Sequence, residues 1–224
     1  MNFQIHFIPT CESTNDEAKK LPLNSAIYTA IQTKGKGRTG RKWIDGKGNL
    51  MASITLAKEP NAYFYSFLIS LAVAQSIAFL SPRIKWPNDI LIDGKKISGI
   101  LLETTDDKLI IGVGVNIQNH PEAHLLYETT DLKEYGYIVE AEKLLQDILQ
   151  NLSFMVDLYQ KKGFEQIRLE WLNFACGLGS KILVRLPNKT LTGTFNDIDK
   201  NGALILIDEQ GNKHSITAGD VFMI

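Results

Sequence analysis

The stretch from Gly35 to Trp43 constrains the fold more than any other part of the sequence. It reads Gly-Lys-Gly-Arg-Thr-Gly-Arg-Lys-Trp, with glycines among the cations and no apolar side chain before Trp43. β-Forming residues at 26–32 and 50–57 flank it, which predicts a loop at one end of a sheet. Glycines let backbone N–H groups approach a ligand closely, and cations attract anionic oxygens. We expect this basic loop (residues 34–43) to hold a phosphate-bearing ligand.

Two other interpretations of the basic loop compete with this one. The spacing Gly35-x-Gly37-x-x-Gly40, with Glu59 about 20 residues later, matches the dinucleotide-binding fingerprint. That fingerprint has to open a helix, whereas two more glycines and an Asn follow within residues 43–49, which disfavours helix formation. The second alternative is a solvated basic loop without a ligand, as charge runs often are.

Composition indicates an ordinary globular protein. The chain has 224 residues, 44% of them hydrophobic and 22% charged. Its formal net charge of −1 gives no excess of positive charge that would indicate DNA binding. Cys11 and Cys176 are the only cysteines, and the sequence has no CxxC or His-rich spacing, so we expect no disulfide framework, no protein metal site and a reducing cytoplasm. The start lacks a signal peptide, and serines interrupt the apolar stretch 64–80, which predicts a buried helix and no membrane span.

Hydrophobic periodicity predicts helices over 140–162 and 164–176, after a mixed array of strands. Residues 177–180 (Gly-Leu-Gly-Ser) are the best linker candidate, and the pattern of the sequence changes after them. Short β-forming runs then alternate with turns, at 181–185, 190–195, 203–208, 213–216 and 221–223. We therefore predict a larger domain over 1–177 and a small β-barrel over 178–224, too small to be stable without docking on the larger domain.

The triplet Ser13-Thr14-Asn15 has a structural and a functional interpretation. Thr14 with Glu17 fits a capping box, with Ser13 as the alternative cap, and predicts a short helix through Lys20. Polar groups at a helix N-terminus can instead bind a polar ligand. The residues alone leave both open.

A hairpin is predicted within residues 83–103. Asp93-Gly94 lies between two apolar runs, which is a strong turn signal, and Pro87 holds Trp86 extended. Lys85 and Lys96 fall near the ends of this hairpin; a hairpin lysine is more often simply solvated.

The run 109–117 predicts a strand with Gly112 and Gly114 on one face and Asn116 near its end. The missing side chains would leave a slot for a flat ligand, or else allow close helix packing. Residues 118–134 show little periodicity and predict a mobile loop. His120 and His124 within it lack carboxylate partners in sequence, so they are a weak metal signal.

These segments together resemble the biotin–protein ligases. The basic loop is similar to the family pattern G-R-G-R-x-G-R-x-W, except that Lys36 stands where the family has Arg. Ser-Thr-Asn, Lys-Trp-Pro-Asn-Asp followed by Gly-Lys-Lys-Ile-Ser-Gly-Ile-Leu-Leu-Glu, and the glycine-rich strand occur in the family's order. The resemblance covers essentially the whole chain. It implies an α+β fold, in which helices flank a mixed sheet of the class II synthetase-like kind, with a C-terminal SH3-like β-barrel.

The resemblance also implies an activity. Biotin–protein ligases join biotin to ATP, in the presence of Mg²⁺, to form biotinyl-5'-AMP, and then transfer biotin to one lysine of a carrier domain in a biotin-dependent carboxylase. The family's loop at 118–134 orders over the adenylate. The family's essential lysine falls on Lys96, and we assign Arg38 to the biotin carboxylate and the phosphate, where a guanidinium fork is better than a point charge.

The motifs assign further residues to each substrate. Biotin-binding residues are expected at Ser13, Thr14, Asn15, Gln32, Gly35, Lys36, Gly37, Arg38, Lys96, Gly99, Gly112 and Gly114. Nucleotide-binding residues are expected at Arg38, Arg41, Trp43, Lys85, Asn88 and Asn116.

The sequence departs from the biotin–protein ligase pattern in two respects, and two alternative functions remain. Lys36 keeps the charge of the family's Arg without its bidentate geometry, so we expect adenylation to survive and the intermediate to leak faster. Some family members carry an N-terminal DNA-binding domain, whereas the first strand here begins at Phe3, so we expect a ligase that is not a repressor. A lipoate–protein ligase and a non-catalytic biotin- or nucleotide-binding module of the same fold are the alternatives. Pairing of exposed strands into a homodimer is left open.

Overall fold

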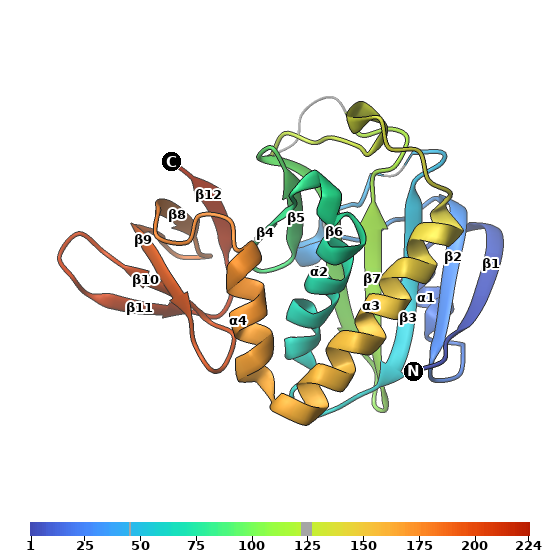
Figure 1. Cartoon of the computed structure of the whole chain (residues 1–224), viewed down its shortest axis with the longest axis horizontal. Helices are drawn as coiled ribbons and strands as arrows, with labels where there is room; N and C mark the ends of the chain where they lie inside the picture. The colour runs from blue at the N-terminus through green and yellow to red at the C-terminus, as the bar shows by residue number, and fades with distance from the viewer. Residues whose placement is uncertain (45, 122–126) are drawn as a thin grey trace.

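A computed structural model describes residues 1–44, 46–121 and 127–224. Within these residues the larger part of the molecule is built on a seven-stranded sheet with the order β1-β2-β3-β7-β6-β5-β4 (Figure 1). The strands are β1 (Gln4–Cys11), β2 (Ser25–Gln32), β3 (Leu50–Ala57), β4 (Arg83–Lys85), β5 (Asp89–Ile92), β6 (Lys95–Thr104) and β7 (Lys108–Val115). β1 and β2 are parallel and the other pairs antiparallel, so the predicted mixed sheet is confirmed.

Helices cover both faces of this sheet unequally. Figure 1 shows α2 (Tyr65–Ser76), α3 (Ala141–Lys162) and α4 (Phe164–Phe174) together on one face. The short α1 (Thr14–Ala18) packs through Ala18 on the opposite face, against Ile27 and Ile110. In the described part of the chain, no helix has the length and apolar character needed to cross a bilayer.

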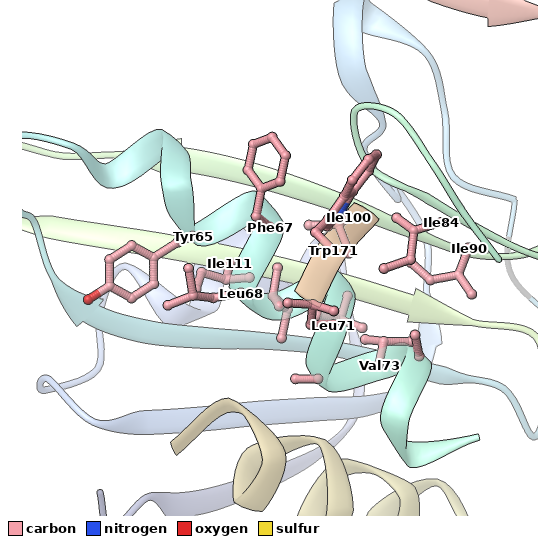
Figure 2. Close-up of a cluster of buried hydrophobic side chains, with 14 of the residues drawn as sticks. Tyr65, Phe67, Leu68, Leu71, Val73, Ile84, Ile90, Ile100, Ile111 and Trp171 are labelled. Carbon is pink, nitrogen blue, oxygen red and sulfur yellow. The ribbon is translucent and has the colours of Figure 1, made fainter. Parts of the chain in front are cut away.

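The alternation of side chains along β6 and β7 separates the core from the opposite face. Ile100 and Ile111 are buried and lie with Leu68 and Leu71 of α2 in the cluster that Figure 2 shows. Since successive residues of a strand point to opposite faces, Gly112 and its neighbours in the pattern point away from α2. The helix-covered face therefore stabilises the sheet, and the other face is free to form a site.

The C-terminal part forms a second, all-antiparallel sheet of the predicted barrel type. This five-stranded sheet lies in residues 177–224, which are described throughout, and has the order β11-β10-β9-β8-β12. The strands are β8 (Lys181–Arg185), β9 (Thr190–Ile198), β10 (Leu204–Ile207), β11 (Lys213–Ile216) and β12 (Asp220–Met223). The indole nitrogen of Trp86 donates to the carbonyl of Gly202 at 3.2 Å, and Arg168 pairs with Asp197, so the two sheets are docked. The domain boundary at 177/178 stays a prediction.

Several local predictions are corrected. The capping box is wrong: Ser13 is the N-cap of α1, its side chain makes no capping hydrogen bond, and Thr14 lies inside the helix. α1 ends at Ala18, and α2 ends at Ser76 before a 3₁₀ turn over Ala78–Leu80. In the predicted loop 118–134, Thr129 bridges to Lys96, so part of that segment is held against β6. Residues 122–126, with His124, lie outside the described residues.

Candidate functional site

A pocket of about 460 Å³ opens on the sheet face opposite α2. It brings together residues far apart in sequence, from α1, the basic loop, the β4–β5 turn, β6, β7 and the C-terminal sheet. The predicted site residues that line it are Ser13, Thr14, Asn15, Gln32, Lys36, Gly37, Arg38, Arg41, Trp43, Lys85, Asn88, Lys96, Gly99, Gly112, Gly114 and Asn116. Gly35 is the one predicted residue outside this lining. A Cβ there would lie 2.5 Å from the Trp43 carbonyl oxygen, so Gly35 allows the two stems of the basic loop to meet.

The basic loop is an ordered hairpin. Trp43 N–H donates to the Gly35 carbonyl at 3.0 Å, and Gly37 N–H donates to the Arg41 carbonyl at 2.7 Å. Thr39 and Gly40 at the tip have φ of 52° and 75°, a left-handed backbone that turns the chain sharply. No longer helix follows: β3 begins at Leu50. The dinucleotide interpretation is therefore wrong, and a loop that lines a pocket is more than a solvated charge run.

The glycines of β6 and β7 make room for protein side chains. Gly99 and Gly114 are partners in the sheet, and the Trp43 ring covers both; a Cβ on Gly99 would lie 2.9 Å from Trp43 Cζ3. A Cβ on Gly112 would lie 2.5 Å from Asn15 Oδ1. The sequence predicts an open slot over the glycines of β7. In the structure the side chains of Trp43 and Asn15 occupy part of that slot and make it narrower. A ligand would contact these two side chains.

One end of the pocket, the polar end, is lined by Ser13, Thr14, Asn15 and Gln32, and Ser53 supports it through hydrogen bonds. The backbone N–H and the hydroxyl of Thr14 both donate to Gln32 Oε1, at 2.8 and 3.1 Å. Ser53 Oγ lies 2.8 Å from Thr14 Oγ1 and 2.6 Å from Asn15 Oδ1. All but Gln32 are buried, so these neutral groups form a preorganised hydrogen-bonding surface.

Ser53 supports the polar end, and sequence reasoning missed it. It is directly opposite Gly112 in the β3–β7 pair and faces the pocket side of the sheet. The only signal in the sequence is a small polar residue within the apolar run of β3. That signal is common in strands, and its meaning depends on which residue is its neighbour.

The opposite end, the cationic end, consists of Arg38, Lys85 and Lys96. Lys96 Nζ lies 2.6 Å from Asp89 Oδ1, and Lys85 Nζ lies 3.7 Å from Asp89 Oδ2. Arg38 donates through Nη1 to Asn88 Oδ1 at 2.8 Å. Asn88 in the β4–β5 turn and Asp89 at the start of β5 therefore orient the three cations.

Lys85 is the most deeply placed of the three cations. Its side chain is 6% exposed, and Nζ lies 3.5 Å from the centre of the Tyr127 ring. Burial lowers the pKa of Lys85; Lys96 adds to this effect, and Asp89 opposes it. Because Asp89 lies as far as 3.7 Å from it, the buried Lys85 ammonium keeps N–H groups that could donate hydrogen bonds to a phosphate.

Two asparagines shape the end of β7. Asn116 Nδ2 donates to the Thr130 carbonyl at 3.0 Å, while its buried Oδ1 has no hydrogen-bond partner among the described residues. Asn49, which sequence reasoning missed, accepts from the N–H groups of Ile117 and Gln118 at 2.9 and 3.0 Å. Asn49 thus fixes the chain that leaves β7, and Asn116, which lines the pocket, keeps a buried acceptor without a described partner.

The C-terminal sheet completes the wall of the pocket. Asp220 of β12 forms an ion pair with Arg41, which lowers the pKa of Asp220. Phe222 stacks on Tyr127 with 5.6 Å between ring centres. No motif in the sequence marked Asp220, Phe222 or Tyr127, because their role arises from docking of the two parts.

Comparisons with known proteins agree with this geometry. A model of the Biotin/lipoate A/B protein ligase family matches residues 7–116, and one of the biotin protein ligase C-terminal domain matches residues 177–223. The chain is 32% identical to the biotin–[acetyl-CoA-carboxylase] ligase of Paracoccus denitrificans over 94% of this chain and 97% of that protein. It is 33% identical to the bifunctional ligase/repressor BirA of Bacillus subtilis over 92% of this chain and 70% of that protein.

Solved structures show the same relationship. The biotin protein ligase of Aquifex aeolicus in complex with biotin and ATP superposes with a TM-score of 0.86 at 26% identity, over 98% of this chain and 97% of that chain. A mutant of the same enzyme in complex with biotin gives a TM-score of 0.89 at 25% identity, with both chains fully covered. Fold and sequence thus agree, and the chain belongs to the biotin–protein ligase family.

Proposed function

We propose that this chain activates biotin with ATP and transfers it to a lysine of a biotin carboxyl carrier domain. In the first step a biotin carboxylate oxygen bonds to the α-phosphorus of ATP, and the bond to the bridging oxygen breaks, so pyrophosphate leaves. In the second step the lysine amine bonds to the acyl carbon of biotinyl-5'-AMP. AMP then leaves with the electron pair of the broken acyl–oxygen bond, and the amine loses a proton.

The observation that carries this proposal is the pairing of Asn88 with Arg38 and of Asp89 with Lys96. A carboxylate that approaches a phosphate is repelled, and negative charge builds up on the phosphoryl oxygens in the transition state. Cations already oriented before the reaction offset that charge without reorganisation. Arg38 and Lys96 are therefore proposed to hold the biotin carboxylate against the α-phosphate.

The polar end is proposed to bind the ureido ring of biotin. A ureido group carries N–H donors and a carbonyl acceptor, and the hydroxyl and amide groups of Ser13, Thr14 and Gln32 can complement both. Neutral partners suit a neutral ring, since a buried unpaired charge would be costly there. Trp43 supplies an aromatic surface between this end and the cationic end.

The nucleotide is proposed to lie at the cationic end. Lys85 and Arg41 are placed to attract its phosphates, and Asn116 Oδ1 to accept from the adenine amino group. Among the described residues, no group of three or more His, Cys, Asp and Glu side chains is arranged to hold a metal ion. Mg²⁺ would accordingly be held mainly by the ATP phosphates and water, where it neutralises phosphate charge.

Mass spectrometry of an isolated carrier domain tests the function. The domain is incubated with this protein, Mg-ATP and either biotin or lipoate. We expect a mass gain of one biotinyl group, lost with Lys96→Ala. A lipoyl gain would move the chain to the lipoate ligases, and no gain despite tight biotin binding would identify a binding module.

Two further expectations belong to the proposal: a cytoplasmic site of action and no binding to DNA. Titration of the purified protein with duplex DNA tests the second, and saturable binding would contradict it. Light scattering decides between a monomer and a homodimer, which the proposal leaves open.

A further inference from the structure

A chain of alternating charges joins the basic loop to the polar end from outside the pocket. Lys36 Nζ lies 2.6 and 2.7 Å from the two carboxylate oxygens of Asp16. Asp16 also lies 3.0 Å from Lys19 Nζ, which lies 3.0 Å from Glu103 Oε2. Glu103 Oε2 in turn accepts from Asn15 Nδ2 at 3.3 Å. We call Lys36, Asp16, Lys19 and Glu103 the charge network.

The charge network connects three separate elements. Lys36 is on the first stem of the basic loop, Asp16 and Lys19 are on and just after α1, and Glu103 is on β6. Lys36 and Asn15 line the pocket, whereas Asp16, Lys19 and Glu103 do not. The network is therefore support for the pocket walls and not part of their surface.

Its energetics suit a movable loop. The four side chains are between 27% and 41% exposed, and isolated pairs at such exposure are weak. Asp16 and Lys19 each serve two partners, so the charges form a connected network, which is the arrangement in which surface pairs contribute most. The hydrogen bond from Lys36 is the main cause that lowers the pKa of Asp16.

The network also explains the unusual lysine of the basic loop. Lys36 stands where the family motif has Arg, and a single ammonium cannot pair in the planar, bidentate manner of a guanidinium. Here the compact ammonium is bound by both oxygens of Asp16. The carboxylate lies on α1, next to Asn15 of the polar end.

We propose that Asp16 and Glu103 are positioning residues that hold the basic loop closed against α1 and fix the Asn15 amide. Loss of Asp16 frees Lys36 and opens the first stem, so water reaches the pocket and bound biotinyl-5'-AMP escapes. This inference deepens the proposed function, and only its statement about biotinyl-5'-AMP rests on that function. The positioning of the loop is independent of any reaction.

Hydrogen exchange of the basic-loop amides in the ligand-free protein is the first test. Asp16→Asn should lower protection over residues 34–43 about fivefold, the factor that corresponds to the loss of about 1 kcal/mol. Glu17→Gln is the matched control, because Glu17 is on the same helix and, among the described residues, forms an ion pair only with exposed Lys20. Equal protection in Asp16→Asn, Glu17→Gln and the unchanged protein would overturn the proposal.

Release of preformed biotinyl-5'-AMP in the absence of acceptor is the second test. Asp16→Asn should release it about fivefold faster at low salt, and Asp16→Glu should restore slow release. At about 1 M salt, where screening acts over about 3 Å, the difference should shrink. Faster release that is independent of salt, or unaltered release, would contradict an electrostatic tether. A protein that makes no adenylate but shows the exchange difference would refute only the reaction.

Discussion

The two ends of the pocket are built on different principles. The polar end is made of neutral groups, all but Gln32 buried, and hydrogen bonds connect Thr14 to Gln32 and Ser53, and Ser53 to Asn15. The cationic end gathers three positive charges; the carboxylate of Asp89 lies near two of them, and Asp220 pairs with Arg41 nearby. The polar end has its hydrogen bonds largely satisfied, while the cationic end has unbalanced charge. We infer that the first recognises biotin and the second drives the chemistry.

Removal of Lys96 should break the cationic end most completely. Lys96→Ala is expected to lower kcat about 10²–10³-fold, because an oriented charge at the reacting oxygens is lost. Biotin affinity should change far less. Single-turnover formation of biotinyl-5'-AMP measures the first effect and calorimetry the second.

Lys95→Ala is the matched control for this change. Lys95 precedes Lys96 on β6 and does not line the pocket. Lys95→Ala should leave kcat unchanged. A similar loss of kcat in both variants would mean that the substitutions had damaged the hairpin and that the Lys96 charge was not the cause.

A change at the polar end should act on biotin alone. Thr14→Val keeps the shape of the side chain but leaves Gln32 and Ser53 without the Thr14 hydroxyl. We expect the KM for biotin to rise about tenfold, because buried polar groups lose a partner, with kcat and the KM for ATP nearly unchanged. Thr55→Val is the control: its buried hydroxyl donates to the Ala18 carbonyl outside the pocket, so stability should fall while the KM stays. A large loss of kcat in Thr14→Val would remove the distinction between the two ends.

The pH dependence of ATP binding should report on Lys85. Burial lowers the pKa of Lys85, so the folded protein loses this charge as the pH rises through the lowered pKa. The KM for ATP should rise up to about tenfold over the same pH range. Between the lowered pKa and the ordinary lysine pKa the unfolded chain binds more protons than the folded one, so the free energy of unfolding should increase with pH. Lys85→Arg should keep the KM for ATP flat over the window; an equal rise in this variant would assign the titration to another group.

The smallest expected effect concerns the contact between the two sheets. Asp220→Asn weakens the partly exposed pair with Arg41, and we expect the KM for ATP to rise about two- to threefold because Arg41 is less well positioned. Asp197→Asn breaks a different ion pair, between β9 of the C-terminal sheet and Arg168 of α4, away from the pocket. A KM shift of the same size in both variants would point to loosened docking and not to Arg41.

Much of the local structure could be predicted because its signals are local. The Asp93-Gly94 turn between β5 and β6 is one example, since both residues adopt positive φ. The placement of β3 beside β7, and the parallel pairing of β1 and β2, are contacts between distant segments. No short pattern encodes them.

The site shows the same limit. Lys96 and the basic loop were marked by motifs, whereas Ser53 and Asp220 are ordinary residues in sequence that gain a role from what lies opposite. Thr14 illustrates the converse. Its local pattern favours a helix cap, but Gln32 and Ser53, brought close by the fold, bind its hydroxyl instead. A tertiary contact overrode a local preference.

Biotin-dependent exchange of pyrophosphate into ATP, measured across a biotin titration, tests the division between the two ends most directly. Thr14→Val should reach the plateau of the unchanged protein at about tenfold higher biotin. Lys96→Ala should stay about 10²-fold or more below that plateau at every biotin concentration. Recovery of Lys96→Ala by added biotin, or a depressed plateau for Thr14→Val, would contradict the assignment of recognition to the polar end and of chemistry to the cationic end.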